Sequence, residues 1–195
     1  YASRGLGDVY KRQEDMSARG MILKSNVTHL CTTDDPADSL EWHKKIKADK
    51  SFNVQVLPAW RPEAAMKIAD KGFATYVRRL AGAAEMDIGS YDDFKAAMIK
   101  RLEFFNQMGC RASDHSLDYA MYVPATAAEI EDIFASALAG EDITYEEDLK
   151  FKTAFLLFIG REYKRLGWVM QLHYGVKRDN NLSLIHISEP TRRVV

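Results

Sequence analysis

The chain has 195 residues, and 47% of them are hydrophobic, which is enough for a folded domain and excludes a chain that is disordered throughout. It carries 27 Lys and Arg against 28 Asp and Glu, so its net charge of -1 gives no positive field for nucleic acid or an anionic membrane. The longest fully apolar run, Ala154 to Ile159, is far shorter than the roughly 20 residues of a membrane-spanning helix. We therefore expect a soluble protein with no nucleic-acid or membrane partner.

The cysteine content indicates a reducing compartment. Cys31 and Cys110 are the only cysteines, lie far apart in the sequence and form no CxxC pair. This spacing favours neither a disulfide framework nor a thiolate zinc site. No charged segment followed by an apolar core opens the chain, so secretion is not expected and the cytoplasm is the predicted location.

The two ends of the chain differ from the middle. Residues 3–13 read SRGLGDVYKRQ, and residues 182–192 read LSLIHISEPTR. A DNA sequence that encodes the first peptide encodes the second when it is read as its reverse complement, and it resembles a transposase adapter used to prepare sequencing libraries. We therefore predict that residues 1–13 and 182–195 are adapter-derived and not native. The alternative is that Leu182 to Ile187 forms a native strand, which its alternating apolar pattern permits.

The native part, Glu14 to Asn181, is predicted to form one structural unit in which strands alternate with helices. Four short apolar or β-branched runs predict strands: Val27–Thr33, Asn53–Ala59, Cys110–Ser113 and Trp168–His173. Helices between successive strands imply parallel pairing. A complete eightfold barrel needs about 250 residues and eight strands, so this pattern indicates an α/β fold with roughly half of such a barrel.

The first predicted helices follow the first two strands. Asp35 as N-cap and Pro36 as first helical residue predict a helix from Pro36 through Lys47. Pro62 then starts a helix that continues through Ala69, and another is expected from Phe73 to Ala84.

Three further helices carry capping-box signals. Ser90 and Asp93 predict the start of a helix that covers Tyr91–Met108 and ends at Gly109. The same spacing begins two more helices, at Thr126 with Glu129 and at Thr144 with Glu147. The last of them is expected to reach Leu166 and to stop at Gly167, immediately before the fourth strand.

Polar residues follow the carboxyl end of every predicted strand, which is the edge where parallel α/β folds bind ligands. A single polar loop after a strand is ordinary, but four together predict an active-site face. The four groups are Thr32, Thr33, Asp34 and Asp35; Trp60, Arg61 and Glu63; Ser113, Asp114, His115 and Asp118; and His173, Lys177 and Arg178.

Several candidates leave alternatives open. Asp114 and His115 could form an acid/base pair, a metal-ligand pair or a structural turn, although neighbours on a strand point to opposite faces, so at most one needs to face a ligand. His173 is either a core histidine or a base at the rim. Arg61 and Arg178 could each clamp a carboxylate or form a surface ion pair. Glu14 to Asn181 contains no glycine-rich phosphate-loop motif, so no nucleotide cofactor is predicted.

The middle of the chain resembles bacterial uronate isomerase, also called glucuronate isomerase, from Met16 to Asn181. The motifs that carry the resemblance are TTDDPADSLEWH (32–43), VLPAWRPE (56–63), GCRASDHSLD (109–118) and FKTAFLLFIGREYKRLGWVMQLHYGVKRDNN (151–181). The resemblance implies a partial (β/α)8 TIM-type barrel of the amidohydrolase superfamily. It also implies a small-molecule uronate substrate, with D-glucuronate and D-fructuronate, or D-galacturonate and D-tagaturonate, interconverted by proton transfer between C2 and C1.

By this resemblance Asp114 and His173 match catalytic positions, and Arg61 and Arg178 match substrate-binding positions. The family's divalent metal, expected to be zinc, is held by a His-x-His pair on the first barrel strand and an Asp on the last. Neither of these two strands is expected within Glu14 to Asn181, and this range contains no His-x-His pair, so no metal ligand is predicted here.

We therefore expect this chain to be inactive and poorly soluble by itself, because it is a fragment. The full-length proteins of the family are expected to form homo-oligomers. The alternative is a non-catalytic α/β module that binds sugar acids.

Overall fold

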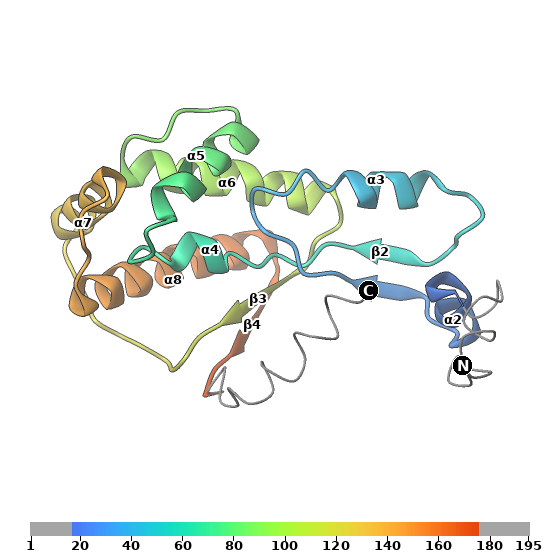
Figure 1. The fold of residues 1–195 in the computed structure, drawn as a ribbon. Helices are drawn as coiled ribbons and strands as arrows, with labels where there is room; N and C mark the ends of the chain where they lie inside the picture. Colours follow the sequence, from blue (N-terminus) through green and yellow to red (C-terminus); the bar gives the residue numbers. More distant parts are fainter. Residues whose placement is uncertain (1–16, 176–195) are drawn as a thin grey trace, which may run out of the picture.

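The computed structural model describes residues 17–175, in which short parallel strands alternate with helices (Figure 1). The prediction of an α/β fold with four parallel strands is confirmed. In chain order the elements are α2 (Ala18–Lys24), β1 (His29–Cys31), α3 (Glu41–Ala48), β2 (Gln55–Leu57), α4 (Glu63–Met66), α5 (Phe73–Ala84), α6 (Tyr91–Gln107), β3 (Ala112–Ser116), α7 (Ala127–Ala139), α8 (Tyr145–Leu166) and β4 (Val169–His173).

The strands form two parallel pairs that are joined at one residue. β1 pairs with β2 and β3 pairs with β4. Trp60, just beyond β2, bridges in parallel to Asp34 on one side and to Ser113 on the other. Its amide N–H donates to the carbonyl of Ala112 at 3.1 Å, and its own carbonyl accepts from the N–H of Asp114 at 2.8 Å. The strands therefore follow one another in chain order, and all their carboxyl ends meet at the same edge.

The three predicted capping boxes begin α6, α7 and α8 as expected. At Ser90, Thr126 and Thr144 the side chain accepts from the backbone N–H three residues later, and the acidic side chain there binds back to the cap. The ends of α7 and α8 follow the sequence as well, because Gly140 and Gly167 adopt the left-handed conformation that glycine takes without strain. These signals act within one helical turn, so they can be read from the sequence alone.

The predicted start of α3 is wrong: the helix begins at Glu41 and not at Pro36. The carbonyl of Pro36 accepts from Nε of Arg101 at 2.7 Å, and the carbonyl of Asp38 accepts from the same guanidinium at 2.6 Å. The Asp35 carboxylate accepts from the N–H of Ala37 at 2.9 Å, so it closes a local turn. Because these groups are already bonded, residues 35–40 form a turn at 36–37 and irregular backbone instead of a helix.

Two other short helices also differ from the predictions. α4 ends at Met66 and not at Ala69, because the N–H of Asp70 donates to the carbonyl of Lys67 at 3.0 Å and closes a turn over residues 67–70. α2 was not predicted, and none of its residues is buried, so no hydrophobic periodicity marks it. Arg19 attaches it to the segment after α3 through bonds of 2.8 Å to Asp49 and Ser51.

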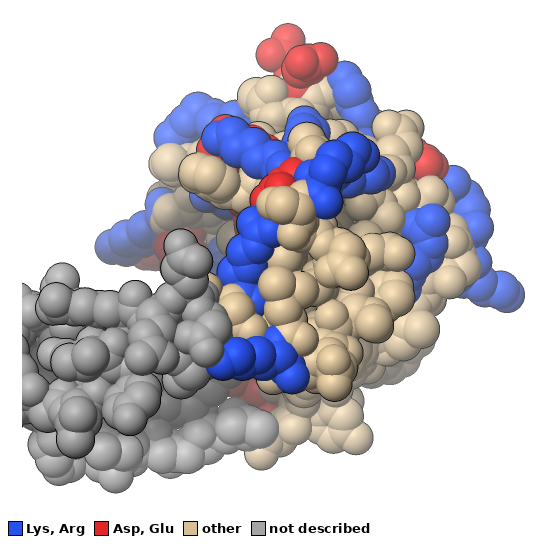
Figure 2. Space-filling view, turned by 90° about the vertical axis from the view of Figure 1, so that its right-hand side faces the viewer, with Lys and Arg blue, Asp and Glu red and all other residues tan. Residues whose placement is uncertain are grey.

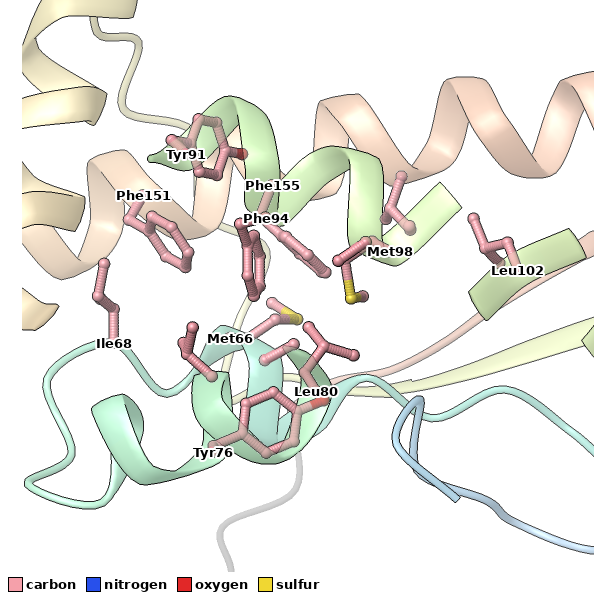
Figure 3. Packing of buried hydrophobic residues seen from close by; sticks show 14 of the residues in the cluster. Met66, Ile68, Tyr76, Leu80, Tyr91, Phe94, Met98, Leu102, Phe151 and Phe155 are labelled. Atoms are coloured by element: carbon pink, nitrogen blue, oxygen red, sulfur yellow. The ribbon is translucent and has the colours of Figure 1, made fainter. Parts of the chain in front are cut away.

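The core lies among helices α4 to α8, where aromatic and aliphatic side chains from several helices pack together (Figure 3). Phe73 of α5 packs against Phe134 of α7 at a centroid distance of 5.8 Å, and against Phe151 of α8 at 6.0 Å. Phe94 of α6 completes the group at 5.3 Å from Phe134. Trp60 connects this layer to the strands through Phe105, at 4.9 Å. Four helices therefore share one apolar layer that supports β3 and β4 from one side.

The end of the molecule that carries α3 displays many Lys and Arg side chains beside uncharged surface (Figure 2). On α3 these lysines make local contacts: Lys44 lies over the ring of Phe104, and Lys45 lies over Trp42 and pairs with Glu41 at 3.5 Å. Such contacts are typical of a solvated helix face. Within residues 17–175, no helix is long and apolar enough to cross a membrane.

Replacement of Arg101 is expected to lower the free energy of unfolding strongly. The residue is 7% exposed, and its guanidinium donates to the carbonyls of Pro36, Ala83 and Asp38. Replacing it by lysine keeps a charge but cannot reach all three acceptors, so Arg101→Lys should lower the free energy of unfolding by about 2–4 kcal/mol. The measurement is urea unfolding followed by circular dichroism. Arg78→Lys, at an exposed position that bonds only Thr75 of its own helix, is the control; equal midpoints for both variants would contradict the prediction.

Candidate active site at the carboxyl edge of the strands

The backbone brings three of the four predicted site residues to one edge. The N–H of Arg61 donates to the carbonyl of Asp34 at 2.9 Å, and the N–H of Asp114 donates to the carbonyl of Trp60. The N–H of Leu117 donates to the carbonyl of His173 at 2.8 Å. Arg61, Asp114 and His173 therefore stand in adjacent positions along the sheet edge. The fourth predicted residue, Arg178, lies outside the described residues.

The side chains of these three residues form a continuous polar chain. Nδ1 of His173 lies 2.6 Å from Oδ1 of Asp114, and Nη1 of Arg61 lies 3.4 Å from Oδ2 of the same carboxylate. Nε of Arg61 donates to Oε2 of Glu63 at 2.9 Å. Asp114 is 17% exposed at its side chain, against 54% for His173. A largely buried carboxylate thus joins a guanidinium to an imidazole that remains open to solvent.

His115 points to the opposite face of β3 and has a structural role. It is 1% exposed, and its Nε2 lies 3.0 Å from the hydroxyl of Tyr163 on α8. Burial lowers the pKa of His115 to about 4, and the nearby charge of Asp114 opposes this effect only partly. Because Asp114 and His115 face opposite sides, they are neither an acid/base pair nor joint metal ligands.

The polar group after β1 does not join the site, which corrects the expectation that all four groups share one face. Thr32 donates to Oδ2 of Asp34 at 2.6 Å and lies 2.7 Å from Nε2 of His43, which is a buried residue of α3. Asp35 instead accepts from Arg79 of α5 at 2.6 Å. These residues bind the strand edge to helices on the outer layer, so their polarity is satisfied within the fold.

One residue at the site, Gln171, was not found from the sequence. Its side-chain nitrogen lies 3.2 Å from Nε2 of His173. It stands opposite Asp114 in the β3–β4 register. The signal that could have found it is the period of two along a strand, which places Gln171 and His173 on the same face.

Two cavities differ in their relation to this edge. One, of about 160 Å³, is lined by Glu63, Lys67, Ser116 and Asp118 among others and adjoins the Arg61–Glu63 pair. The other, of about 630 Å³, lies between α3 and the start of β2 and extends to Gly109, away from the polar chain. Charged groups from several elements converge on the smaller cavity, so it is the better candidate of the two for a ligand site at this edge.

No group of three or more His, Cys, Asp or Glu side chains within residues 17–175 is placed to hold a metal ion. Asp114 and His173 are bonded to each other and are only two such groups. The described residues therefore do not fit a metal centre by themselves. That the family's metal ligands lie elsewhere stays a prediction.

Comparison with known proteins indicates the family of this chain. The sequence profile described as glucuronate isomerase matches residues 8–190. The uronate isomerase of Lachnoclostridium phytofermentans is 56% identical over 170 residues, covering 87% of this chain and 36% of that protein. The uronate isomerase of Lachnospira eligens is 52% identical over 172 residues, covering 88% and 37%. The chain thus spans about a third of the length of these relatives.

Solved structures give the same result. The crystal structure of uronate isomerase from Thermotoga maritima matches with a TM-score of 0.82 at 32% identity, over 92% of this chain and 40% of that one. Glucuronate isomerase from Caulobacter crescentus matches with a TM-score of 0.79 at 27% identity, over 89% and 36%. The segments predicted to be adapter-derived, 1–13 and 182–195, lie outside the described residues, so that interpretation stays a prediction.

The lowered pKa of His115 predicts that the fold loses stability as the pH falls. Its folded value of about 4 lies below the ordinary 6.5, so between these values the unfolded chain binds more protons. Stability should therefore be fully present above pH 6.5 and fall as the pH drops toward 4, by up to about 3 kcal/mol from this group. The measurement is the urea midpoint at several pH values.

The variant His115→Gln should show a smaller loss of stability over that range than the unmodified chain. His29→Gln, at an exposed position on β1, is the control and should keep the full pH dependence. If His115→Gln kept it too, burial of this imidazole would not be its cause.

Proposed function

Because the chain belongs to the glucuronate isomerase family, we propose that it supplies a central part of the active site of a uronate isomerase. Its fold is accordingly a partial (β/α)8 TIM-type barrel of the amidohydrolase superfamily. The proposed reaction interconverts D-glucuronate with D-fructuronate, and D-galacturonate with D-tagaturonate. The observation that carries the assignment to these residues is the carboxylate of Asp114, which is shared between His173 and Arg61.

The proposed chemistry moves a proton between C2 and C1 of the open-chain sugar through an enediol. Such a step needs a base that later acts as an acid, and His173 is exposed enough to reach a substrate. Asp114 accepts from Nδ1 of the ring, so it orients the imidazole and stabilises the positive charge that forms when Nε2 takes up a proton. We propose that Asp114 and His173 act together as this catalytic pair.

The substrate carboxylate is proposed to bind Arg61 and Arg178. Arg61 already donates Nε to Glu63 and places Nη1 near Asp114, so two carboxylates offset its charge. Its Nη2 has no hydrogen bond to the residues that the structure describes. The direction of Nη2 is fixed because the contacts of Nε with Glu63 and of Nη1 with Asp114 hold the planar guanidinium. We propose that Arg61 uses this nitrogen to orient the substrate, while Arg178 supplies the net positive charge.

The remaining proposals concern the complete family protein. A divalent metal, expected to be zinc, would be held by residues outside the described part of this chain, and no step above depends on it. A homo-oligomer is proposed for the same complete protein. The cytoplasm is the proposed location, and the free thiols of Cys31 and Cys110 support it.

The proposed function can be tested by a chimera. Residues 17–175 would replace the matching segment of the Lachnoclostridium phytofermentans uronate isomerase, and conversion of D-glucuronate would be assayed against the parent. The chimera should be active, and Asp114→Asn and His173→Gln should each lower kcat by about 100-fold or more, since general acid–base groups contribute that much. Glu141→Gln, at an exposed position after α7, should leave kcat unchanged.

Two results would count against the proposal. A folded chimera without activity, beside an active parent, would show that these residues cannot serve in a uronate isomerase. An active chimera whose kcat survived both substitutions would instead reject the roles of Asp114 and His173.

The chain of 195 residues by itself is predicted to lack isomerase activity, because it spans only 36% of its relative and its described residues hold no complete metal site. The measurement is the same assay on the purified chain with added zinc. Turnover above that of His173→Gln would refute this prediction. Binding of D-glucuronate without turnover would favour the alternative of a sugar-acid-binding module.

A further inference from the structure

The two ring nitrogens of His173 have different neighbours on the same face of the sheet. Nδ1 lies 2.6 Å from the carboxylate of Asp114, and Nε2 lies 3.2 Å from the side-chain nitrogen of Gln171. Gln171 stands opposite Asp114 in the strand register, and it precedes His173 by two residues on β4. Both neighbours are therefore placed by the backbone of the sheet.

The chemistry of these neighbours determines where the proton of a neutral ring lies. An ionised carboxylate only accepts hydrogen bonds, so Nδ1 must carry the hydrogen that faces Asp114. An amide nitrogen only donates, so Nε2 must offer its lone pair to Gln171. Each contact favours the Nδ1–H tautomer, and the two together are needed to fix it.

We propose that Gln171 is a positioning residue that, together with Asp114, fixes His173 as the Nδ1–H tautomer. This rests on the proposed function in one respect: Nε2 is then the nitrogen that exchanges a proton with the sugar. The amide of Gln171 holds that nitrogen as an acceptor until a substrate hydroxyl takes its place. The His173 side chain is 54% exposed, so packing does not fix the ring and these two polar contacts do.

The tautomer can be measured without any enzymatic activity. The full chain would be labelled with ¹⁵N-histidine, and long-range ¹H–¹⁵N spectra would be recorded at alkaline pH, where imidazoles are neutral. The His173 signals would be identified by their loss in His173→Gln. We expect Nδ1 at the pyrrole-type position and Nε2 at the pyridine-type position. Nε2 at the pyrrole-type position in the unmodified chain would overturn the proposal.

Substitutions at Gln171 then test its part in the effect. Gln171→Glu places an acceptor at Nε2, so both ¹⁵N signals should shift toward the Nε2–H form. Gln171→Leu removes the donor and should give a mixture, also detected as a shift. Gln107→Glu, an exposed position at the end of α6, is the matched control and should change neither signal. Unchanged His173 signals in both Gln171 variants would reject a role for Gln171.

The outcome is independent of the activity test. His29 gives an internal reference for folding, because it lies on β1, away from the β3–β4 pair. A fixed tautomer beside an inactive chimera would uphold the positioning role and reject the reaction. An active chimera with the Nε2–H tautomer would uphold the reaction and reject the positioning role.

Discussion

The arrangement of the candidate site depends on the backbone of Trp60. This residue alone bridges the β1–β2 pair to the β3–β4 pair among the described residues, through its N–H to Ala112 and its carbonyl to Asp114. Its side chain is fully buried against Phe105 and Trp168, so the helical core holds the backbone in place. The next residue, Arg61, is thereby placed beside Asp114. The separation of the guanidinium from the carboxylate is therefore set by this junction and not by either strand pair alone.

The alternation of side chains along the strands then divides polar residues between chemistry and structure. Asp114 and His115 are neighbours in sequence, yet one belongs to the site and the other is sealed against Tyr163. Likewise Thr32 and Asp34 turn to His43 on the helix side. A polar residue at the edge of a parallel sheet is therefore informative only once its face is known, because a period of two gives either outcome.

The capping boxes and the parallel pairing of the strands could be predicted from the sequence, whereas the helix start that depends on a distant side chain could not. The caps at Ser90, Thr126 and Thr144 depend on residues three positions away and were right. The start of α3 depends on Arg101, which bonds Pro36 across 65 residues of sequence, and it was wrong. At the site the same rule holds. The motifs indicated Arg61, Asp114 and His173, whereas the contact of Gln171 with His173 required the side-chain geometry.

The position of His173 on β4 explains why its polar contacts matter. β3 has a parallel neighbour on each side at the level of Ser113, and its residues Ser113 and His115 are buried. β4 pairs only with β3 among the described residues, and Val169, Leu172 and His173 remain exposed. A ring on such a strand gains little order from packing, since few atoms surround it. Directional hydrogen bonds can still fix its orientation and its tautomer while one nitrogen stays within reach of a substrate. The proposed proton-transfer role of His173 on this exposed strand therefore needs a more deeply held partner on the adjacent strand, and Asp114 is in that place.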